Sequence, residues 1–214
     1  MLDDIFIKYK SIVQQVDFLF NAIQERYPAC VQCKIHCCDC CYAFFGVFPV
    51  EAAYINYHFN RSERKIKRDI LRGVEKTETQ MLKTLDKLQV FNDKPEMKIY
   101  GLGKERMRCP FLTDKKECIL YEKRPIICRV YGVPFSINDG KKEKVYVCPV
   151  SGFKEKVSYP TVKLDKIYHK LCQLSGELIT SSGSTQAKKA SLMLPLSKVL
   201  KMPLEAIIKG DFGE

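Results

Sequence analysis

The sequence predicts a mainly helical α+β protein with an irregular, loop-rich central region that cysteine-ligated metal organises. Three observations predict this class. Apolar residues recur at three- and four-residue steps near both ends of the chain, which is typical of amphipathic helices. Between residues 92 and 150 that periodicity disappears, and prolines and glycines divide the chain into short segments. Most of the eleven cysteines gather in two knots, at residues 30–41 and 109–148.

Three helices are expected before the central region. The first begins at about Asp3 or Asp4 and ends at about Tyr27, because Pro28 follows. A short helix follows a turn at Pro49. A long helix is expected over residues 62–90, where a single apolar face of the kind that packs on a core is formed by Ile66, Ile70, Val74, Thr77, Met81, Leu85 and Leu88.

The central region is expected to hold short strands, and helices return after it. Candidate strands are residues 99–103, 118–121, 126–133 and 144–148, and NDGKK at 138–142 indicates a hairpin turn. A helix is expected from about Asp165, then a polar and mobile stretch at 180–190, then one or two short helices near 195–209. This organisation predicts a cysteine-cluster metal-binding domain over 1–164 and a helical extension over 165–214.

Composition limits the function classes. A chain of 214 residues suits one large domain, and 46% hydrophobic with 29% charged residues is ordinary for a globular protein. The net charge of +11 raises the question of nucleic acid, but the basic residues are dispersed and accompany no nucleic-acid motif, so such a partner is not expected. No apolar stretch is long enough to span a membrane.

The cysteine knots indicate metal ligation. Asp3 and Asp4 stand where a signal peptide carries positive charge, so a cytoplasmic, reducing location is expected. Dense cysteines in such a compartment favour metal binding or catalysis over a disulfide framework, which the odd total would also leave incomplete. Buried thiols without a ligand remain the other alternative.

The first knot has an informative spacing. Cys33, Cys37, Cys40 and Cys41 read C-x3-C-x2-C-C, and the side chains of adjacent residues in an extended segment point to opposite sides. One of Cys40 and Cys41 is therefore expected to serve a second metal, a different iron of a cluster, or nothing. The first three also have the spacing of radical S-adenosylmethionine enzymes, but the chain lacks the alternation of strand and helix that a β/α barrel requires.

Several separate motifs, in order over residues 30–153, resemble a known family. They are the knot ending in Cys40-Cys41, FPVEAAYI with Glu51, RCPFL, CILYEKRPIICRVYGV, and Cys148-Pro149. The chain resembles the CxxCxxCC cysteine-cluster family, also called YkgJ-like, which is described as a putative zinc- or iron-chelating domain. The resemblance implies as ligands Cys33, Cys37, Cys40, Cys41, Cys109, Cys118, Cys128 and Cys148, and it leaves Cys30, Cys38 and Cys172 as spares.

The resemblance also bears on the cofactor. A distant relative, the flagellin lysine methylase, is implied to use an iron–sulfur cluster with S-adenosylmethionine, which favours an iron–sulfur cluster over zinc here. Glu51, Arg124 and Arg129 match family positions beside the cysteine motifs. They could orient ligands and offset thiolate charge around the cofactor, or simply form surface ion pairs and caps. His36 is expected to be a solvated or supporting group, and His58 and His169 structural.

The expected function is metal binding in a redox, sensing or group-transfer role, with an iron–sulfur cluster such as 4Fe-4S. One alternative is a structural zinc protein that docks on a macromolecular partner, such as another protein, through its basic surface. Another is a metal-dependent enzyme similar to a methyltransferase. Because neither knot alone offers an unambiguous four-thiolate cage, we expect the two knots to fold onto each other and share at least one site.

Overall fold

A computed structural model describes residues 1–87, 105–138, 142–154 and 157–213. The expected mainly helical α+β class is confirmed. The helices are α1 (Leu2–Arg26), α2 (Pro49–Asn60), α3 (Arg64–Lys87), α5 (Ile126–Val130), α6 (Leu164–Ser181), α7 (Leu196–Lys201) and α8 (Leu204–Lys209). The 3-10 helices are η1 (Asp39–Tyr42), η3 (Tyr121–Lys123) and η4 (Ala187–Ser191), and the strands are β1 (Gly46–Val47), β2 (Phe135–Asn138), β3 (Glu143–Tyr146), β4 (Val162–Lys163) and β5 (Leu194–Pro195).

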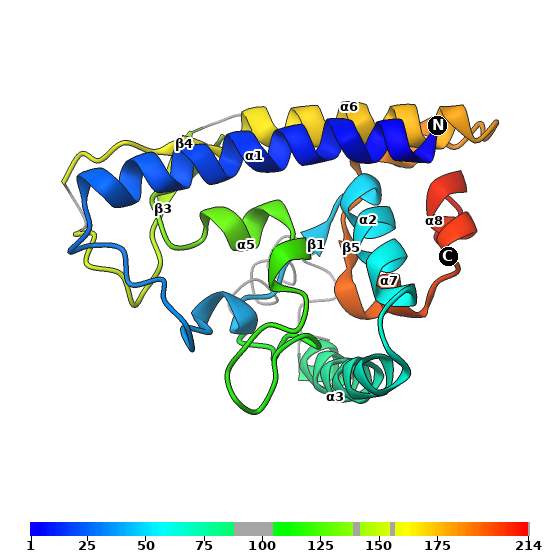
Figure 1. The fold of residues 1–214 in the computed structure, drawn as a ribbon, viewed down its shortest axis with the longest axis horizontal. Coiled ribbons are helices and arrows are strands. Elements are labelled where there is room, and N and C mark those ends of the chain that lie inside the picture. Colours follow the sequence, from blue (N-terminus) through cyan, green and yellow to red (C-terminus); the bar gives the residue numbers. More distant parts are fainter. Residues whose placement is uncertain (88–104, 139–141, 155–156, 214) are drawn as a thin grey trace.

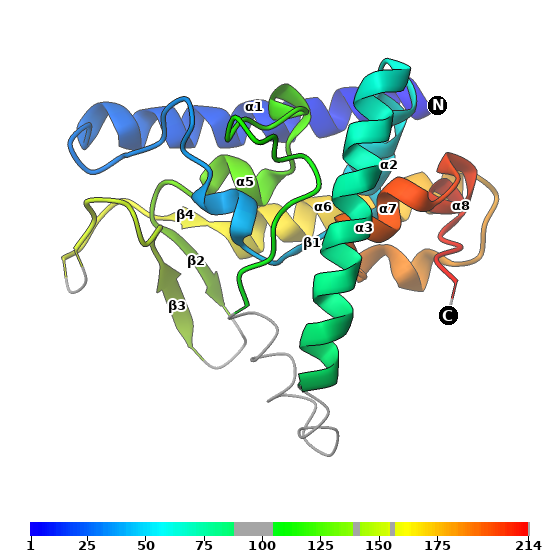
Figure 2. The ribbon, with the colours of Figure 1, turned by 90° about the horizontal axis from the view of Figure 1, so that it is seen from below.

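The two long helices α1 and α6 lie side by side along one edge of the molecule and run in opposite directions (Figure 1). Each buries one apolar face, which in α1 includes Ile5, Tyr9, Ile12, Val16 and Ile23. α1 also packs on α5 and α2, so this pair forms the layer behind the central region. α3 crosses at the opposite side of the central region, where it packs on α7 (Figures 1 and 2).

Buried polar contacts fix α2 between the C-terminal elements. The Asn56 amide donates to the carbonyl oxygens of Val199 and Met202 at 2.8 and 2.9 Å, which holds the end of α7. The backbone N–H of Val50 donates to the Ser175 hydroxyl of α6 at 3.1 Å. Because residues 165–214 contribute to the same apolar core as the earlier helices, the two parts of the expected domain division pack together.

The strands form two small sheets. β1 pairs with β5 in an antiparallel arrangement, and β2 lies between β3 and β4, antiparallel to the first and parallel to the second. The β2–β3 pairing of Asn138 with Glu143 agrees with the expected hairpin, whose turn residues 139–141 lie outside the described residues. The expected strand at 144–148 corresponds to β3, while that at 99–103 lies outside the described residues.

Two expected strands are wrong. Residues 126–133 contain the helix α5, because Pro125 fixes the turn before it and a buried carboxylate caps its first N–H. Residues 118–121 form a single bridge at Cys118 and then turn into η3. The other expected helices are observed as α1, α2, α3, α6, α7 and α8, with residues 88–90 of the long helix outside the described residues.

Candidate metal centre

The two cysteine knots face one cavity of about 420 Å³. Its lining contains all eight cysteines of the expected ligand set: Cys33, Cys37, Cys40, Cys41, Cys109, Cys118, Cys128 and Cys148. Of the described cysteines, Cys30, Cys38 and Cys172 are not among the lining residues. The expectation that the knots fold onto each other therefore agrees with the structure, whereas ligation of metal by these sulfurs stays a prediction.

A short backbone ladder joins the knots. The N–H of Cys109 donates to the carbonyl of Cys41 at 2.7 Å, and that of Met107 donates to the carbonyl of Tyr42 at 2.9 Å. Ala43 and Arg106 form an antiparallel bridge at the end of the same ladder. Residues 106–109 thus run alongside the end of the first knot and bring the second set of cysteines to it.

Separate local structures present the remaining cysteines. Cys118 ends a tight hairpin in which the N–H of Ile119 donates to the carbonyl of Phe111 at 2.9 Å. Cys128 lies in α5, one turn after Pro125, and is held by that short helix. Cys148 is buried just after β3. Cysteines that reach one cavity on separate local structures match the irregular character of the central region.

Four sulfurs form an inner set, which we define as Cys41, Cys109, Cys118 and Cys128. The ionisation of Cys41 and of Cys128 is opposed by Cys109 and Cys118 as well as by Cys40, so these groups lie close enough to repel one another as thiolates. Burial raises the pKa of Cys109 to about 12 and that of Cys118 to about 11. A cation would offset both the burial penalty and the repulsion, and so would allow these buried or half-buried thiols to ionise together.

The outer set is Cys33, Cys37 and Cys148. The ionisation of Cys33 and of Cys148 is opposed by Cys37 and by Cys40. Cys33 is exposed and Cys37 half-buried, so this side of the cavity is the more open one. Cys40 adjoins both sets. The thiols of Cys128 and Cys41 donate hydrogen bonds to it, and these bonds hold the pKa of Cys40 well below its usual range. The same bonds raise the pKa of the two donors, Cys41 and Cys128.

Backbone N–H groups already point at three of the sulfurs. Phe111 donates to Cys109, Leu120 to Cys118 and Val150 to Cys148, in each case from two residues further along the chain, and each bond favours the thiolate. Hydrogen bonds to sulfur of this kind stabilise the charge of a metal-bound thiolate and tune the potential of an iron–sulfur cluster. The donor set therefore fits a thiolate-bound metal or cluster.

Arg124 is the cation most closely associated with the sulfurs. It lines the cavity, its guanidinium lies 4.0 Å from the centre of the Tyr121 ring, and its charge favours the thiolates of Cys33, Cys40 and Cys118. Its Nε is buried and has no hydrogen-bond partner within the described residues. This buried N–H of Arg124 would gain a hydrogen-bond acceptor if a negatively charged sulfur of a bound metal centre lay next to it.

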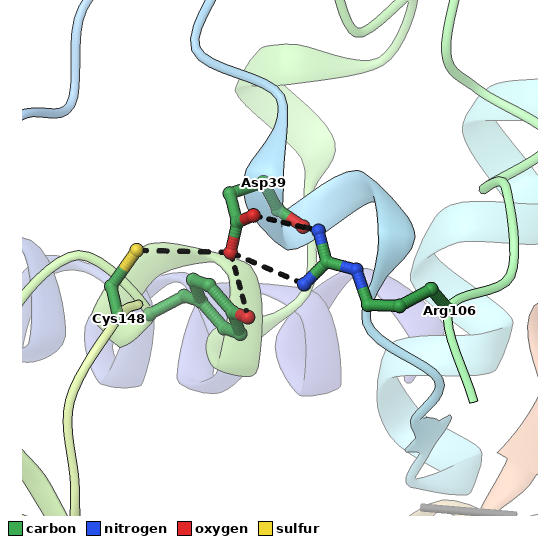
Figure 3. A network of polar contacts seen from close by, with 4 residues as sticks. Asp39, Arg106 and Cys148 are labelled. Atoms are coloured by element: carbon green, nitrogen blue, oxygen red, sulfur yellow. Dashed lines mark hydrogen bonds and ion pairs between the residues drawn. The ribbon is translucent and has the colours of Figure 1, made fainter. Parts of the chain in front are cut away.

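Asp39 and Tyr131 line the cavity although the sequence did not predict a role for them. The Asp39 carboxylate accepts from Arg106 Nη2 at 2.6 Å and from the Tyr131 hydroxyl at 3.0 Å, and the Cys148 thiol lies 3.8 Å from it (Figure 3). Burial opposes ionisation of Asp39, but the bonds from Arg106 and Tyr131 lower its pKa. The place of Asp39 inside the first knot was the one available signal; the Arg106 contact was not visible in the sequence.

Gly132 has a packing role beside the outer set. A Cβ at this position would lie 2.1 Å from Cys33 Sγ and 3.2 Å from the Phe20 ring. Glycine is therefore required for the close approach of Cys33 to the end of α5.

Glu51 and Arg129 support the wall of the cavity and are not among its lining residues. Glu51 is 2% exposed, and its two oxygens accept the N–H of Phe48 at 3.0 Å and of Ile126 at 2.9 Å. Arg129 pairs with Asp17 of α1 at 2.7 Å and donates to the carbonyls of Arg124 and Glu122. Both residues hold α5 and the turn before it, and so they position Cys128.

The histidines occupy different surroundings. His36 lines the cavity with a backbone φ of 68°, and its Nδ1 lies 3.0 Å from the carbonyl oxygen of Lys115. His58 packs on the Tyr54 ring with centroids 4.5 Å apart. His169 is exposed on α6.

A ready-made site for a single metal ion and a membrane-spanning helix are both absent from the described residues. Within residues 1–87, 105–138, 142–154 and 157–213, no three His, Cys, Asp or Glu side chains are arranged to hold a single metal ion. None of the helices in these ranges has the length and apolar character that crossing a bilayer demands.

Comparison with known proteins gives one match. The profile of the CxxCxxCC family, described as "putative zinc- or iron-chelating domain", matches residues 29–149, which is more than half of the chain. That description agrees with the cofactor expected from the sequence, an iron–sulfur cluster or zinc. No curated protein and no solved structure matches the chain.

Proposed function

This chain belongs to the CxxCxxCC family of zinc- or iron-chelating cysteine-cluster domains, and from that premise we propose that its cavity carries an iron–sulfur cluster with a redox, sensing or group-transfer role. The observation that carries the proposal is the convergence of eight cysteine side chains from both knots on one cavity. Eight cysteines drawn from both knots to one cavity suit metal ligation, because a cation would stabilise the thiolates that burial and mutual repulsion otherwise oppose.

Within the described residues no three of these side chains are already arranged to hold a metal ion, so the inner set, Cys41, Cys109, Cys118 and Cys128, would have to close around one centre through four thiolates when metal binds. The outer set with Cys40, namely Cys33, Cys37, Cys40 and Cys148, would hold further iron or a second metal. The adjacency of Cys40 and Cys41 fits this division, because Cys40 interacts with both sets and Cys41 with the inner one. When bound, an iron–sulfur cluster supplies one-electron chemistry or an open iron for a ligand.

The surrounding residues supply the environment such a cluster needs. Arg124 offers a buried N–H and a positive charge, and the N–H groups of Phe111, Leu120 and Val150 donate to sulfur. Asp39, held by Arg106 and Tyr131, faces Cys148 and places negative charge at the outer set. Positive charge and N–H donors stabilise the more negative, reduced state of a cluster, whereas the carboxylate of Asp39 stabilises the oxidised state. The two sides of the cavity would therefore favour different oxidation states.

A structural zinc protein that docks through its basic surface is the second candidate. The grouping of four cysteines in the inner set favours it, because four thiolates complete a closed structural zinc site. The arrangement of eight sulfurs around one shared cavity favours the cluster instead, since two closed zinc sites would need two separate cages. The exposure of Cys33 leaves room for a ligand or substrate at the outer set, as group transfer would require.

The deciding experiment is anaerobic purification with an absorption spectrum and a metal analysis. A brown protein with absorbance near ~400 nm and matching iron and sulfide supports the cluster. A colourless protein with stoichiometric zinc contradicts it and supports the structural alternative.

Single substitutions test the ligand set in the same measurement. Cys118→Ala and Cys128→Ala should lower the metal content. Cys172→Ala, a matched control on α6 that packs against the apolar core, should leave it unchanged. Equal loss of metal in all three variants would mean that the assignment of the cysteines is wrong.

A further inference from the structure

A groove between α1 and the segment that enters α6 lies apart from the cysteine cavity. It has a volume of about 440 Å³, which is within the range of small-molecule sites. One helical face of α1, from Ile12 to Arg26, forms one wall, and residues 160–170 form the other. At about 1.5 Å per residue this wall is roughly 21 Å long. The groove is therefore elongated along α1.

The floor of the groove is apolar. Its lining includes the buried side chains of Ile12, Val16, Ile23, Val162 and Ile167. Leu19 lines the groove as well and remains 41% exposed, and Ala22 beside it is exposed. Apolar surface is thus left in contact with water along the groove, and its burial by a ligand would be favourable.

The rim of the groove is cationic. Arg26, Lys163, Lys166 and Lys170 line it, and none of the described residues in the lining is acidic. Lys163 pairs with Glu143 and Lys170 donates to Gln15, whereas Arg26 and Lys166 form no ion pair within the described part of the chain. Two cations therefore remain free to bind an anionic group.

We propose that this groove binds a single-chain amphipathic anion, with the hydrocarbon chain along α1 and a carboxylate or phosphate head at the cationic rim to which Arg26 and Lys166 contribute. The long apolar floor matches an extended chain, and the cationic rim without acids matches a negative head.

Isothermal titration of the intact, metal-loaded protein tests the proposal with four monomeric probes that share a twelve-carbon chain. Dodecanoate and dodecyl phosphate have the anionic heads, dodecanol is neutral and dodecylamine is cationic. We expect one saturable site for at least one anion, with the stronger of the two identifying the head group. Dodecanol should bind at least tenfold more weakly and dodecylamine should show no saturable binding.

Two kinds of variant locate the site. Arg26→Glu with Lys166→Glu should weaken binding of the anion at least tenfold by reversing the rim charge. Ala22→Trp should abolish it by filling the groove with the charges left intact. Lys65→Glu with Arg68→Glu on exposed positions of α3 makes the same change in net charge far from the groove and should leave binding unaltered.

Several outcomes would overturn the proposal. They are the absence of saturable binding by both anions, equal binding of dodecylamine, and undiminished binding by the folded Ala22→Trp or double charge variant. Binding of an acidic helical peptide in preference to both anions would likewise refute it and assign the groove to a protein partner. Circular dichroism checks that each variant is folded, and because the two variants act on different properties, either alone keeps the test decisive.

Discussion

Glu51→Gln removes one oxygen acceptor from the interior and should destabilise the protein without changing its shape. Both carboxylate oxygens are in use, one by the N–H of Phe48 and the other by that of Ile126. In glutamine an NH₂ group replaces one of these oxygens, so that a hydrogen-bond donor faces the backbone N–H donor of Phe48 or Ile126. A buried donor left without a partner costs about 1–3 kcal/mol. Glu51→Ala leaves two such donors and should cost roughly twice as much.

Thermal unfolding followed by circular dichroism measures this loss. For a chain of this size, 1 kcal/mol corresponds to about 2–4 °C in Tm, so Glu51→Gln should lower Tm by roughly 2–12 °C. The matched control is Glu177→Gln, because Glu177 is a half-exposed partner of Lys8 at the surface, where an ion pair contributes little. If both variants melt at the same temperature as the wild type, the capping role assigned to Glu51 is wrong.

The same variant separates positioning from direct contact with a cofactor. Ile126 begins α5, which carries Cys128, so a weakened cap should lower metal affinity through that helix. Excess metal should then restore full occupancy and raise Tm toward that of the wild type, by mass action. A metal deficit that persists in excess metal, together with an unchanged Tm, would instead mean that Glu51 touches the bound group.

Four further outcomes are expected. Gly132→Ala should displace Cys33 and reduce metal content, with a stability cost of about 1–3 kcal/mol, whereas Gly176→Ala, where a Cβ has room, should not; equal metal content in both would contradict the assigned packing. Burial raises the pKa of Glu51 from 4.5 to about 7, so the stability it provides is full below pH 4.5 and falls as the pH rises through 7; urea titrations should show this fall, and Glu51→Gln should lack it. Buried thiols with a raised pKa must lose protons to bind metal, so binding should release protons and strengthen from pH 6 to 8; calorimetry in buffers of different ionisation enthalpy that finds no release would refute this. Metal removal should expose residues 105–153 to protease while α3 stays protected, and identical digestion of both forms would show that metal does not organise that region.

The sequence predicts those parts of the fold that depend on interactions between residues close together in the chain. α1, α3 and α6 follow from apolar residues spaced three and four apart, and α1 and α6 end close to the expected residues. The eight cavity cysteines also follow from motifs that occur in order along the chain. Such features are visible because the interactions responsible for them are local or repeat over several turns.

The errors have a non-local origin. Residues 126–133 are rich in β-branched and aromatic side chains and resemble a strand, but Glu51, which is 75 residues away, caps the first N–H and favours a helix. Asp39 gains its role through Arg106, which is 67 residues away and lies outside the cysteine motifs. Neither contact leaves a pattern in the local sequence, so neither could be predicted before the chain was folded.

The match to the family ends at residue 149, but the wall of the cavity does not. Leu196 lines it from the C-terminal part of the chain, Phe20 of α1 packs against Gly132, and Asp17 of α1 holds Arg129. The segment that recurs as a family is therefore smaller than the unit that folds. Members of such a family can keep every cysteine and still alter access to the metal, its solvation or its potential by exchanging the flanking helices, so selection on the flanks can change the chemistry of an unchanged motif.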